Sequence, residues 1–199
     1  MTKVKICGLT RPCDRDFVNE AKPEYVGFVF AESRRKVSHL LAQSLRERLD
    51  PSIIPVGVFV NEPMEQIIAL IQAEIIGIVQ LHGTEDEEYI KRLKTLTDAP
   101  VIKAVAVHGE GDVQKWASSS ADYLLLDNPG GGTGKCFDWD LLGNIDKPFF
   151  LAGGLGIENV ADAVRRVNPF AVDVSSGVET DGYKDASKIK EFIRRTRNE

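Results

Sequence analysis

The sequence predicts an α/β protein in which eight parallel strands close into a (β/α)8, or TIM, barrel. Eight short apolar segments rich in Val, Ile and Phe begin about every 21 to 29 residues along the chain. Most of the intervening segments repeat apolar residues with the period of an amphipathic helix. Strands that are apolar along their whole length are typical of parallel sheets covered by helices, and eight strands close this barrel.

The apolar segments give the positions of the expected strands. They lie at residues 4–7, 25–30, 54–60, 75–81, 101–107, 123–127, 149–152 and 171–174. Each is long enough for one strand and too short for an average helix.

Helix signals lie between these strands. Ser38 precedes a helical segment at 40–49, Thr84 and Glu87 have the spacing of a capping box, and Pro63 is expected in a first helical turn. Two late segments carry an apolar stripe on one helix face, namely Ile157, Val160, Ala161 and Val164, and Ile189, Phe192 and Ile193.

The length limits the architecture. A chain of 199 residues is short for a barrel of this type, which typically needs about 250. We therefore expect one domain over residues 1–199 with short loops, and only a brief helix between residues 137 and 147 after the sixth strand. An open doubly wound sheet is the structural alternative.

Composition and charge favour a small ligand. With 25 basic and 30 acidic residues the net charge is −5, which argues against nucleic acid or an anionic membrane as the main partner. No apolar stretch reaches the length of a membrane span, and Lys3 and Lys5 interrupt any signal sequence. We expect a cytoplasmic monomer, with a homodimer left open.

The cysteines indicate neither disulfides nor a metal site. Cys7, Cys13 and Cys136 are odd in number and lack zinc-ligand spacing. Cys7 ends the first expected strand, directly before Gly8, and strand alternation places it on the same face as Lys5. A nearby ammonium group favours the thiolate, so Cys7 is a candidate base with a lowered pKa. The alternative is a small buried hydrophobe at a strand end.

Other polar residues also follow strands, and active sites of such barrels lie at the carboxyl ends of the strands. The second strand leads to Ser33-Arg34-Arg35-Lys36, a basic cluster suited to binding a carboxylate. The fourth ends in Gln80 and His82, which share one face. The alternatives are a solvated loop for the cluster and a structural role for His82.

The sixth strand ends in Asp127 after three leucines. Desolvation by this apolar wall is expected to raise the pKa of Asp127 and make it a proton donor; a turn-forming role is the alternative. The glycine-rich segment 130–135 that follows lacks the first glycine and the Ser/Thr of a P-loop. We interpret it instead as a mobile loop over the substrate.

The last two strands lead to loops of small residues. Gly153 and Gly154 follow the seventh strand, and Ser175, Ser176 and Gly177 follow the eighth. Loops at these positions commonly bind phosphate through backbone N–H groups; simple turns are the alternative. Asp173 on the eighth strand faces the first strand in a closed barrel, so a pair with Lys5 is expected.

These motifs resemble the phosphoribosylanthranilate isomerase family over nearly the whole chain. The resemblance rests on Lys5-Ile6-Cys7-Gly8-Leu9-Thr10, Gly27-Phe28-Val29-Phe30, Gln80-Leu81-His82-Gly83, Leu126-Asp127, Gly131-Gly132-Thr133-Gly134 with Phe137-Asp138-Trp139, Leu151-Ala152-Gly153-Gly154-Leu155 with Asn159-Val160, and Asp173-Val174-Ser175-Ser176-Gly177-Val178-Glu179.

The resemblance implies a (β/α)8 barrel of tryptophan biosynthesis that performs an Amadori rearrangement without cofactor or metal. The substrate would be a phosphorylated aminosugar, N-(5-phosphoribosyl)anthranilate, and the product the aminoketose 1-(2-carboxyphenylamino)-1-deoxyribulose 5-phosphate. Cys7 would be the general base and Asp127 the general acid. Substrate binding would involve Arg35, Gln80 and His82, with the phosphate at Gly154, Ser175, Ser176 and Gly177.

Some assignments stay open within this resemblance. The family often has Ser-Pro-Arg-Tyr where this chain has Ser33-Arg34-Arg35-Lys36, so it is open which basic residue meets the carboxylate. Cys13 and Cys136 receive no role. The alternatives are another phosphosugar barrel, such as indole-glycerol-phosphate synthase or the histidine-pathway isomerase, and a non-catalytic barrel that binds a phosphorylated ligand.

Overall fold

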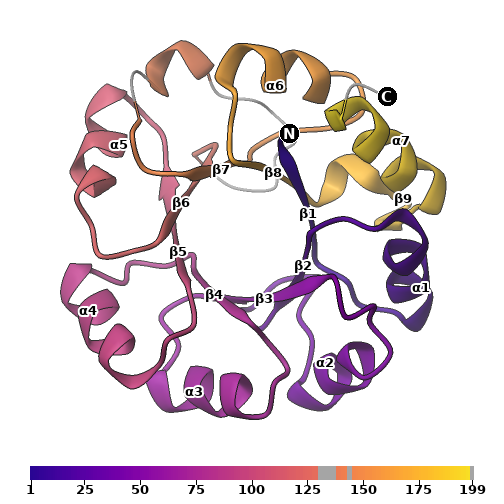
Figure 1. Ribbon diagram of the computed structural model, residues 1–199, viewed down its shortest axis with the longest axis horizontal. Helices are drawn as coiled ribbons and strands as arrows, with labels where there is room; N and C mark the ends of the chain where they lie inside the picture. Colours follow the sequence, from indigo (N-terminus) through magenta and orange to yellow (C-terminus); the bar gives the residue numbers. More distant parts are fainter. Residues whose placement is uncertain (130–137, 143–144, 198–199) are drawn as a thin grey trace.

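A computed structural model describes residues 1–129, 138–142 and 145–197 of the chain. Eight parallel strands form a closed barrel in the order of the sequence, from β1 to β8, and β8 pairs with β1. Helices surround the barrel on the outside (Figure 1). The predicted fold class is therefore confirmed.

The strands follow the apolar segments closely. They are β1 (Lys3–Cys7), β2 (Tyr25–Val29), β3 (Ile54–Phe59), β4 (Ile78–Leu81), β5 (Val101–Ala106), β6 (Tyr123–Asp127), β7 (Phe149–Leu151) and β8 (Ala171–Val174). The prediction that the fourth strand begins at residue 75 is wrong. Ile75 and Ile76 are buried in the core from the connection before β4, so burial rather than strand pairing accounts for their apolar character.

The helices are α1 (Pro12–Ala21), α2 (His39–Arg46), α3 (Met64–Gln72), α4 (Glu87–Leu96), α5 (Glu110–Ala117), α6 (Val160–Val167) and α7 (Ala186–Arg197), with short 3-10 helices η1 (Trp139–Leu142) and η2 (Ser176–Val178). The brief helix expected between β6 and β7 is η1. A two-stranded hairpin of β9 (Glu179–Thr180) and β10 (Tyr183–Lys184) follows η2.

The helix-start signals were only partly correct. Ser38 caps α2 as expected, because its side chain accepts a hydrogen bond from the Leu41 N–H. The capping box at Thr84 is wrong: Asp86 caps α4 by accepting from the Tyr89 N–H, while the Thr84 hydroxyl donates to Asn61. Pro63 occupies the position before α3 rather than its first turn.

Two apolar layers hold the barrel together. Inside it, Tyr25, Val56, Ile78, Ile102, Leu125, Phe150, Ala152 and Ala171 form one buried cluster. A larger cluster packs the outward-facing strand residues against the helices, including Ile189, Phe192 and Ile193 of α7. Side chains on a strand alternate between these two layers, so each strand has one face in the barrel and one beneath the helices.

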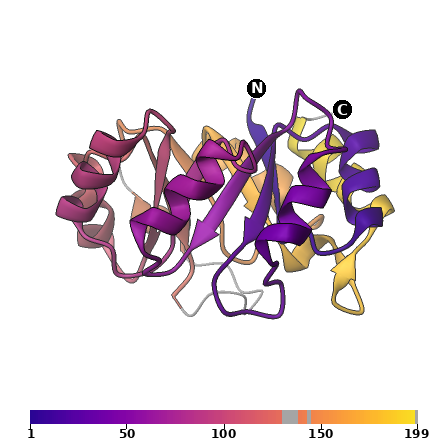
Figure 2. The same cartoon turned by 90° about the horizontal axis from the view of Figure 1, so that it is seen from below.

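The carboxyl ends of the strands lie at one edge of the barrel. In Figure 2 this is the lower edge, and both chain ends lie at the upper edge. No helix in the described residues is long and apolar enough to cross a membrane.

An ion pair also lies inside the barrel, as predicted from the sequence. Lys5 on β1 lies opposite Asp173 on β8, and Lys5 Nζ is 3.0 Å from Asp173 Oδ1. The Lys5 side chain is fully buried. Although burial lowers the pKa of this ammonium group, Asp173 and Cys7 together outweigh burial and the pKa is raised.

Replacing Asp173 with Asn should lower the free energy of unfolding by about 3 to 5 kcal/mol, because it leaves a buried charge without its counter-ion. The measurement is urea denaturation. Glu20→Gln is the control, because it breaks the exposed pair between Glu20 and Lys190 and should cost less than about 1 kcal/mol. Equal effects of the two variants would contradict a structural role for the buried pair.

Candidate functional site

Cys7 lies at the carboxyl end of β1. It is two residues after Lys5 and therefore shares the inward-facing side of the strand. Gly27, its partner on β2, makes room for it: a Cβ on Gly27 would lie 2.6 Å from Cys7 Sγ. The half-buried thiol therefore sits at the rim of the barrel interior.

The sequence-based prediction of a lowered Cys7 pKa is wrong. Burial raises the pKa of the thiol, and the opposing effects of Lys5 and Lys184 do not outweigh it. The carboxylate of Asp173 also raises it, which offsets part of the effect of Lys5. Charges on both sides of the ion pair thus act on the thiol, and desolvation decides the direction.

Asp127 ends β6, across the barrel from β1 (Figure 1). Burial raises its pKa, as the three preceding leucines predicted, and His82 opposes this shift. Its Oδ1 accepts a hydrogen bond of 2.7 Å from the Asn128 N–H. Gly153 allows the next strand end to approach, because a Cβ there would lie 2.9 Å from Asp127 Oδ1.

His82 and Gln80 join Asp127 in one polar group. His82 Nε2 lies 3.6 Å from Asp127 Oδ2, and Gln80 Nε2 lies 2.9 Å from His82 Nδ1. Burial lowers the pKa of His82, which favours neutral imidazole. With Gln80 donating to Nδ1, the imidazole proton is on Nε2 and faces Asp127. A cavity of about 300 Å³ lies beside His82 and Asp127.

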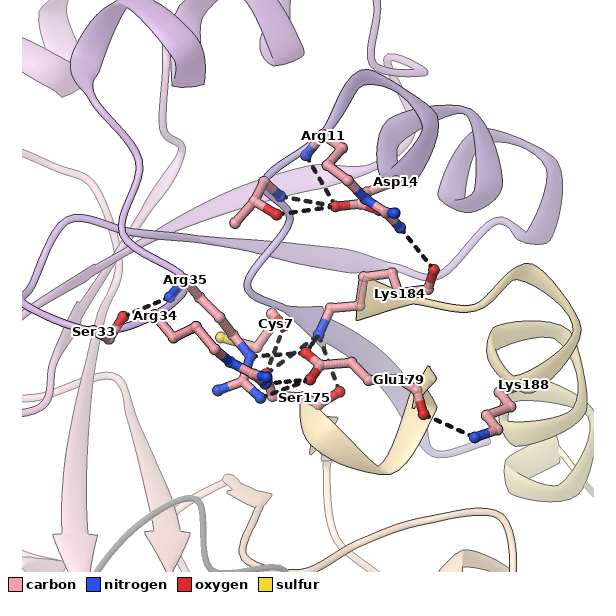
Figure 3. Close-up of polar contacts among 11 residues, drawn as sticks. Cys7, Arg11, Asp14, Ser33, Arg34, Arg35, Ser175, Glu179, Lys184 and Lys188 are labelled. Atoms are coloured by element: carbon pink, nitrogen blue, oxygen red, sulfur yellow. Dashed lines mark hydrogen bonds and ion pairs between the residues drawn. The ribbon is translucent and has the colours of Figure 1, made fainter. Parts of the chain in front are cut away.

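Arg35 reaches the site from the loop after β2. Its stem passes over Gly8, where a Cβ would lie 2.4 Å from Arg35 Cδ, so the guanidinium group lies beside the end of β1 (Figure 3). Its Nε and Nη2 donate to the two oxygens of Glu179 at 2.7 and 2.9 Å. Arg34 also contacts Glu179, whereas Lys36 pairs with the exposed Glu32.

The loops after β7 and β8 touch each other. A Cβ on Gly177 would lie 2.0 Å from the Leu155 carbonyl oxygen, so this contact requires glycine. Gly154 and η2, which contains Ser176 and Gly177, are thereby brought together. The first N–H groups of a helix have no acceptor within the helix, so those of η2 are suited to an anion.

Ser175 connects this loop to β1 and to Lys184 by hydrogen bonds. Its hydroxyl donates to the Cys7 carbonyl oxygen at 3.0 Å, and Lys184 Nζ lies 3.0 Å from its carbonyl oxygen. Ser175 therefore ties the end of β8 to the end of β1.

Glu179 and Lys184 also belong to the site, although the sequence motifs assign no role to either residue. These two residues are cross-strand partners in the β9/β10 hairpin, and Lys184 Nζ donates to Glu179 Oε1 at 2.7 Å. The signal was present: Asp181-Gly182 is a preferred two-residue hairpin turn, and both residues have positive φ.

The structure assigns no role to Cys13 and does not describe the glycine-rich segment or Cys136. The glycine-rich segment 130–135 and Cys136 lie outside the described residues. Cys13 is half-buried at the start of α1, with no feature that gives it a role. Among the described residues, no group of three or more His, Cys, Asp or Glu side chains is arranged to hold a metal ion.

A closed barrel with an acid, a thiol and basic groups at the carboxyl ends of its strands defines the class of (β/α)8-barrel enzymes. A family model described as N-(5'phosphoribosyl)anthranilate (PRA) isomerase matches residues 4–195. The chain therefore belongs to the N-(5'-phosphoribosyl)anthranilate isomerase family.

Individual relatives agree along the full chain. The N-(5'-phosphoribosyl)anthranilate isomerases of Endomicrobium trichonymphae and Clostridium acetobutylicum are each 50% identical, over 98% and 99% of this chain and 98% of theirs. The phosphoribosyl anthranilate isomerase structure from Thermotoga maritima has a TM-score of 0.91 at 40% identity, covering 100% of both chains. A further isomerase structure, in complex with reduced 1-(o-carboxyphenylamino)-1-deoxyribulose 5-phosphate, has a TM-score of 0.89 at 39% identity and also covers 100% of both chains.

The raised pKa of Cys7 predicts slow alkylation of this thiol at neutral pH. Because the thiolate is the reactive form, the rate with iodoacetamide should keep rising above the ordinary thiol pKa of about 8.5. The measurement is the pH dependence of alkylation in a variant with Cys13 and Cys136 replaced by Ser. A midpoint below the ordinary value would contradict the dominance of burial and restore the sequence-based expectation.

Proposed function

We propose that this protein converts N-(5-phosphoribosyl)anthranilate into 1-(2-carboxyphenylamino)-1-deoxyribulose 5-phosphate, an Amadori rearrangement of tryptophan biosynthesis. The observation that carries the proposal is the placement of Asp127 and Cys7 on facing walls of one barrel mouth. Membership of the isomerase family supports the choice of substrate and reaction.

Asp127 is the general acid in the proposed mechanism. Its raised pKa makes the carboxyl group a better proton carrier near neutral pH than an exposed aspartate. It donates a proton to the ring oxygen of the ribose, and the bond between this oxygen and C1 breaks. The nitrogen lone pair then forms a double bond to C1, which gives an open-chain iminium ion.

Cys7 is the general base. The iminium group acidifies C2, so the thiolate removes the C2 proton. The electrons of the C2–H bond form a double bond between C1 and C2, and the electrons of the C1=N double bond return to nitrogen as its lone pair, which gives an enolamine. The enol then transfers its hydroxyl proton to solvent or protein and gains a proton at C1. The product is the aminoketone, and no electrons leave or enter the substrate.

The two groups act in a minor protonation state. Catalysis needs the thiolate of Cys7 together with the protonated form of Asp127, whereas the raised thiol pKa favours the neutral thiol. An isomerase can work this way because the reactive pair is regenerated in each turnover, and a thiolate of high pKa is a stronger base. Cys7 loses its thiol proton before it acts as the base, and it gains a proton from C2 when it acts. Its protonation is therefore balanced over one turnover.

The two ends of the substrate fix the sugar between these groups. Arg35 is proposed to bind the anthranilate carboxylate, and the N–H groups of Gly154, Ser175, Ser176 and Gly177 the phosphate. Gln80 and His82 line the wall beside Asp127, where they contact the sugar. Binding at both ends supplies the orientation that makes acid and base catalysis effective.

We further propose that residues 1–199 form one catalytic domain, because the barrel strands run from β1 at residue 3 to β8 at residue 174. The monomer expected from the sequence stays a prediction. A related isomerase from Thermotoga maritima is dimeric, so sedimentation of this protein is the relevant measurement.

Cys7→Ala and Asp127→Ala should each lower kcat by about 10² to 10⁴, a barrier increase of roughly 3 to 5 kcal/mol, with substrate affinity nearly unchanged. The measurement is the fluorescence of the anthranilate ring after mixing with fresh phosphoribosylanthranilate, corrected for spontaneous breakdown. Normal turnover by either variant would contradict its assigned role. A folded wild type that binds the substrate without turnover would instead indicate a non-catalytic barrel.

A further inference from the structure

Glu179 occupies the centre of a cationic cluster at the barrel mouth. Its carboxylate accepts hydrogen bonds from Arg34, Arg35 and Lys184, and its side chain is only 5% exposed (Figure 3). The mechanism proposed above gives Glu179 no part. Three cations around one carboxylate leave two positive charges, so the cluster still attracts an anion.

The hydrogen bonds to Glu179 use only one edge of the Arg35 guanidinium group. Nε and Nη2 donate to the carboxylate in a bidentate arrangement. Within the described residues no group accepts a hydrogen bond from Nη1 of Arg35. A guanidinium group has five N–H donors in a planar fork, so the edge formed by Nη1 and the second hydrogen of Nη2 is available to another carboxylate.

Glu179 and Gly8 together fix the direction of this free edge. The stem of Arg35 lies against Gly8, directly after Cys7, and Glu179 holds the guanidinium plane at the far end. An arginine side chain that is ordered before binding loses less entropy when a ligand arrives. Because the bond angles of the group are fixed, holding one edge also sets the position of the other.

The same carboxylate is linked to the rest of the site. Lys184 bridges Glu179 and the Ser175 carbonyl oxygen, and the Ser175 hydroxyl donates to Cys7. Hydrogen bonds from Arg35 and Lys184 outweigh burial and lower the pKa of Glu179 to about 2, so its carboxylate is ionised at neutral pH. The ionised carboxylate therefore remains a hydrogen-bond acceptor for Arg35 at neutral pH.

We propose that Glu179 is a positioning residue that orients Arg35, so that the Nη1–Nη2 edge of the guanidinium group receives the carboxylate of the substrate. Glu179 thereby determines specificity for an aminosugar whose aromatic amine carries a carboxylate. This inference rests on the proposed function, in which Arg35 binds that carboxylate. If Glu179 were merely structural, replacing it would impair the conversion of all substrates equally. If Glu179 positions Arg35, replacing it should impair the conversion of the carboxylated substrate only.

The test compares two substrates in Glu179→Gln. One is phosphoribosylanthranilate, and the other is the analogue prepared from ribose 5-phosphate and aniline, which lacks the carboxylate; product formation is followed by NMR. Loss of one charge-assisted arginine contact predicts that KM for the carboxylated substrate rises about tenfold or more. The kinetics of the analogue should stay within about threefold of wild type, as expected when the altered contact is absent.

Three further variants make the result decisive. Arg35→Ala is the reference variant. It should also raise KM for phosphoribosylanthranilate while leaving the kinetics of the analogue nearly unchanged. Glu32→Gln removes the same charge from the neighbouring exposed pair with Lys36 and should leave both substrates unchanged. Glu179→Asp keeps the charge but shortens the reach, so its KM effect should fall between wild type and Glu179→Gln, which tests the proposal if the Gln variant folds poorly.

The outcomes separate the two proposals. If Arg35→Ala does not distinguish the substrates, the assignment of Arg35 to the carboxylate is wrong. If Arg35→Ala distinguishes them but Glu179→Gln weakens both equally, Glu179 is structural and the inference is overturned. A lower KM in Glu179→Gln would also overturn it, because Glu179 would then be a competitor for Arg35 rather than its support.

Discussion

The ion pair between Lys5 and Asp173 is the interaction on which the site depends. It joins the first and last strands of the barrel, and it lies beside the cluster of apolar side chains inside the barrel. Its two charges reach Cys7, His82 and Asp127, and at each of the three they act in opposite directions. The pair therefore closes the barrel while adding little net charge to its mouth.

Burial consequently determines the direction in which the pKa values of the titratable groups at the barrel mouth shift. Desolvation is the largest cause of the pKa shift at Cys7, His82 and Asp127, and in each case it favours the neutral form. The raised pKa of the Asp127 carboxyl group suits its proposed role as a proton donor, and the raised pKa of the Cys7 thiol makes its thiolate, once formed, a stronger base. The fixed charges gather instead at the rim, where Arg35, Glu179 and Lys184 lie, and where the anionic ends of the substrate would bind.

The sequence predicted the barrel well because each strand is apolar on both faces. It also predicted the Lys5–Asp173 pair, because strand alternation places both side chains inside the barrel and closure of β8 on β1 places them side by side. The predicted direction of the Cys7 pKa shift was wrong because the sequence shows the nearby lysine but not how deeply the thiol is buried, and burial is the largest cause of the shift. Glu179 was not assigned a role because its partner Arg35 is 144 positions away in the chain, and only the fold brings them together.

The most direct test of the account is a crystal structure of this protein with the reduced aminoketose product bound. We predict Cys7 Sγ against C2, Asp127 against the C4 oxygen that closed the ribose ring, the phosphate on the loops after β7 and β8, and the carboxylate on the Nη1–Nη2 edge of Arg35, with Glu179 still bound to Nε. A ligand placed with its sugar remote from Cys7 and Asp127, or with its carboxylate displacing Glu179, would contradict the account.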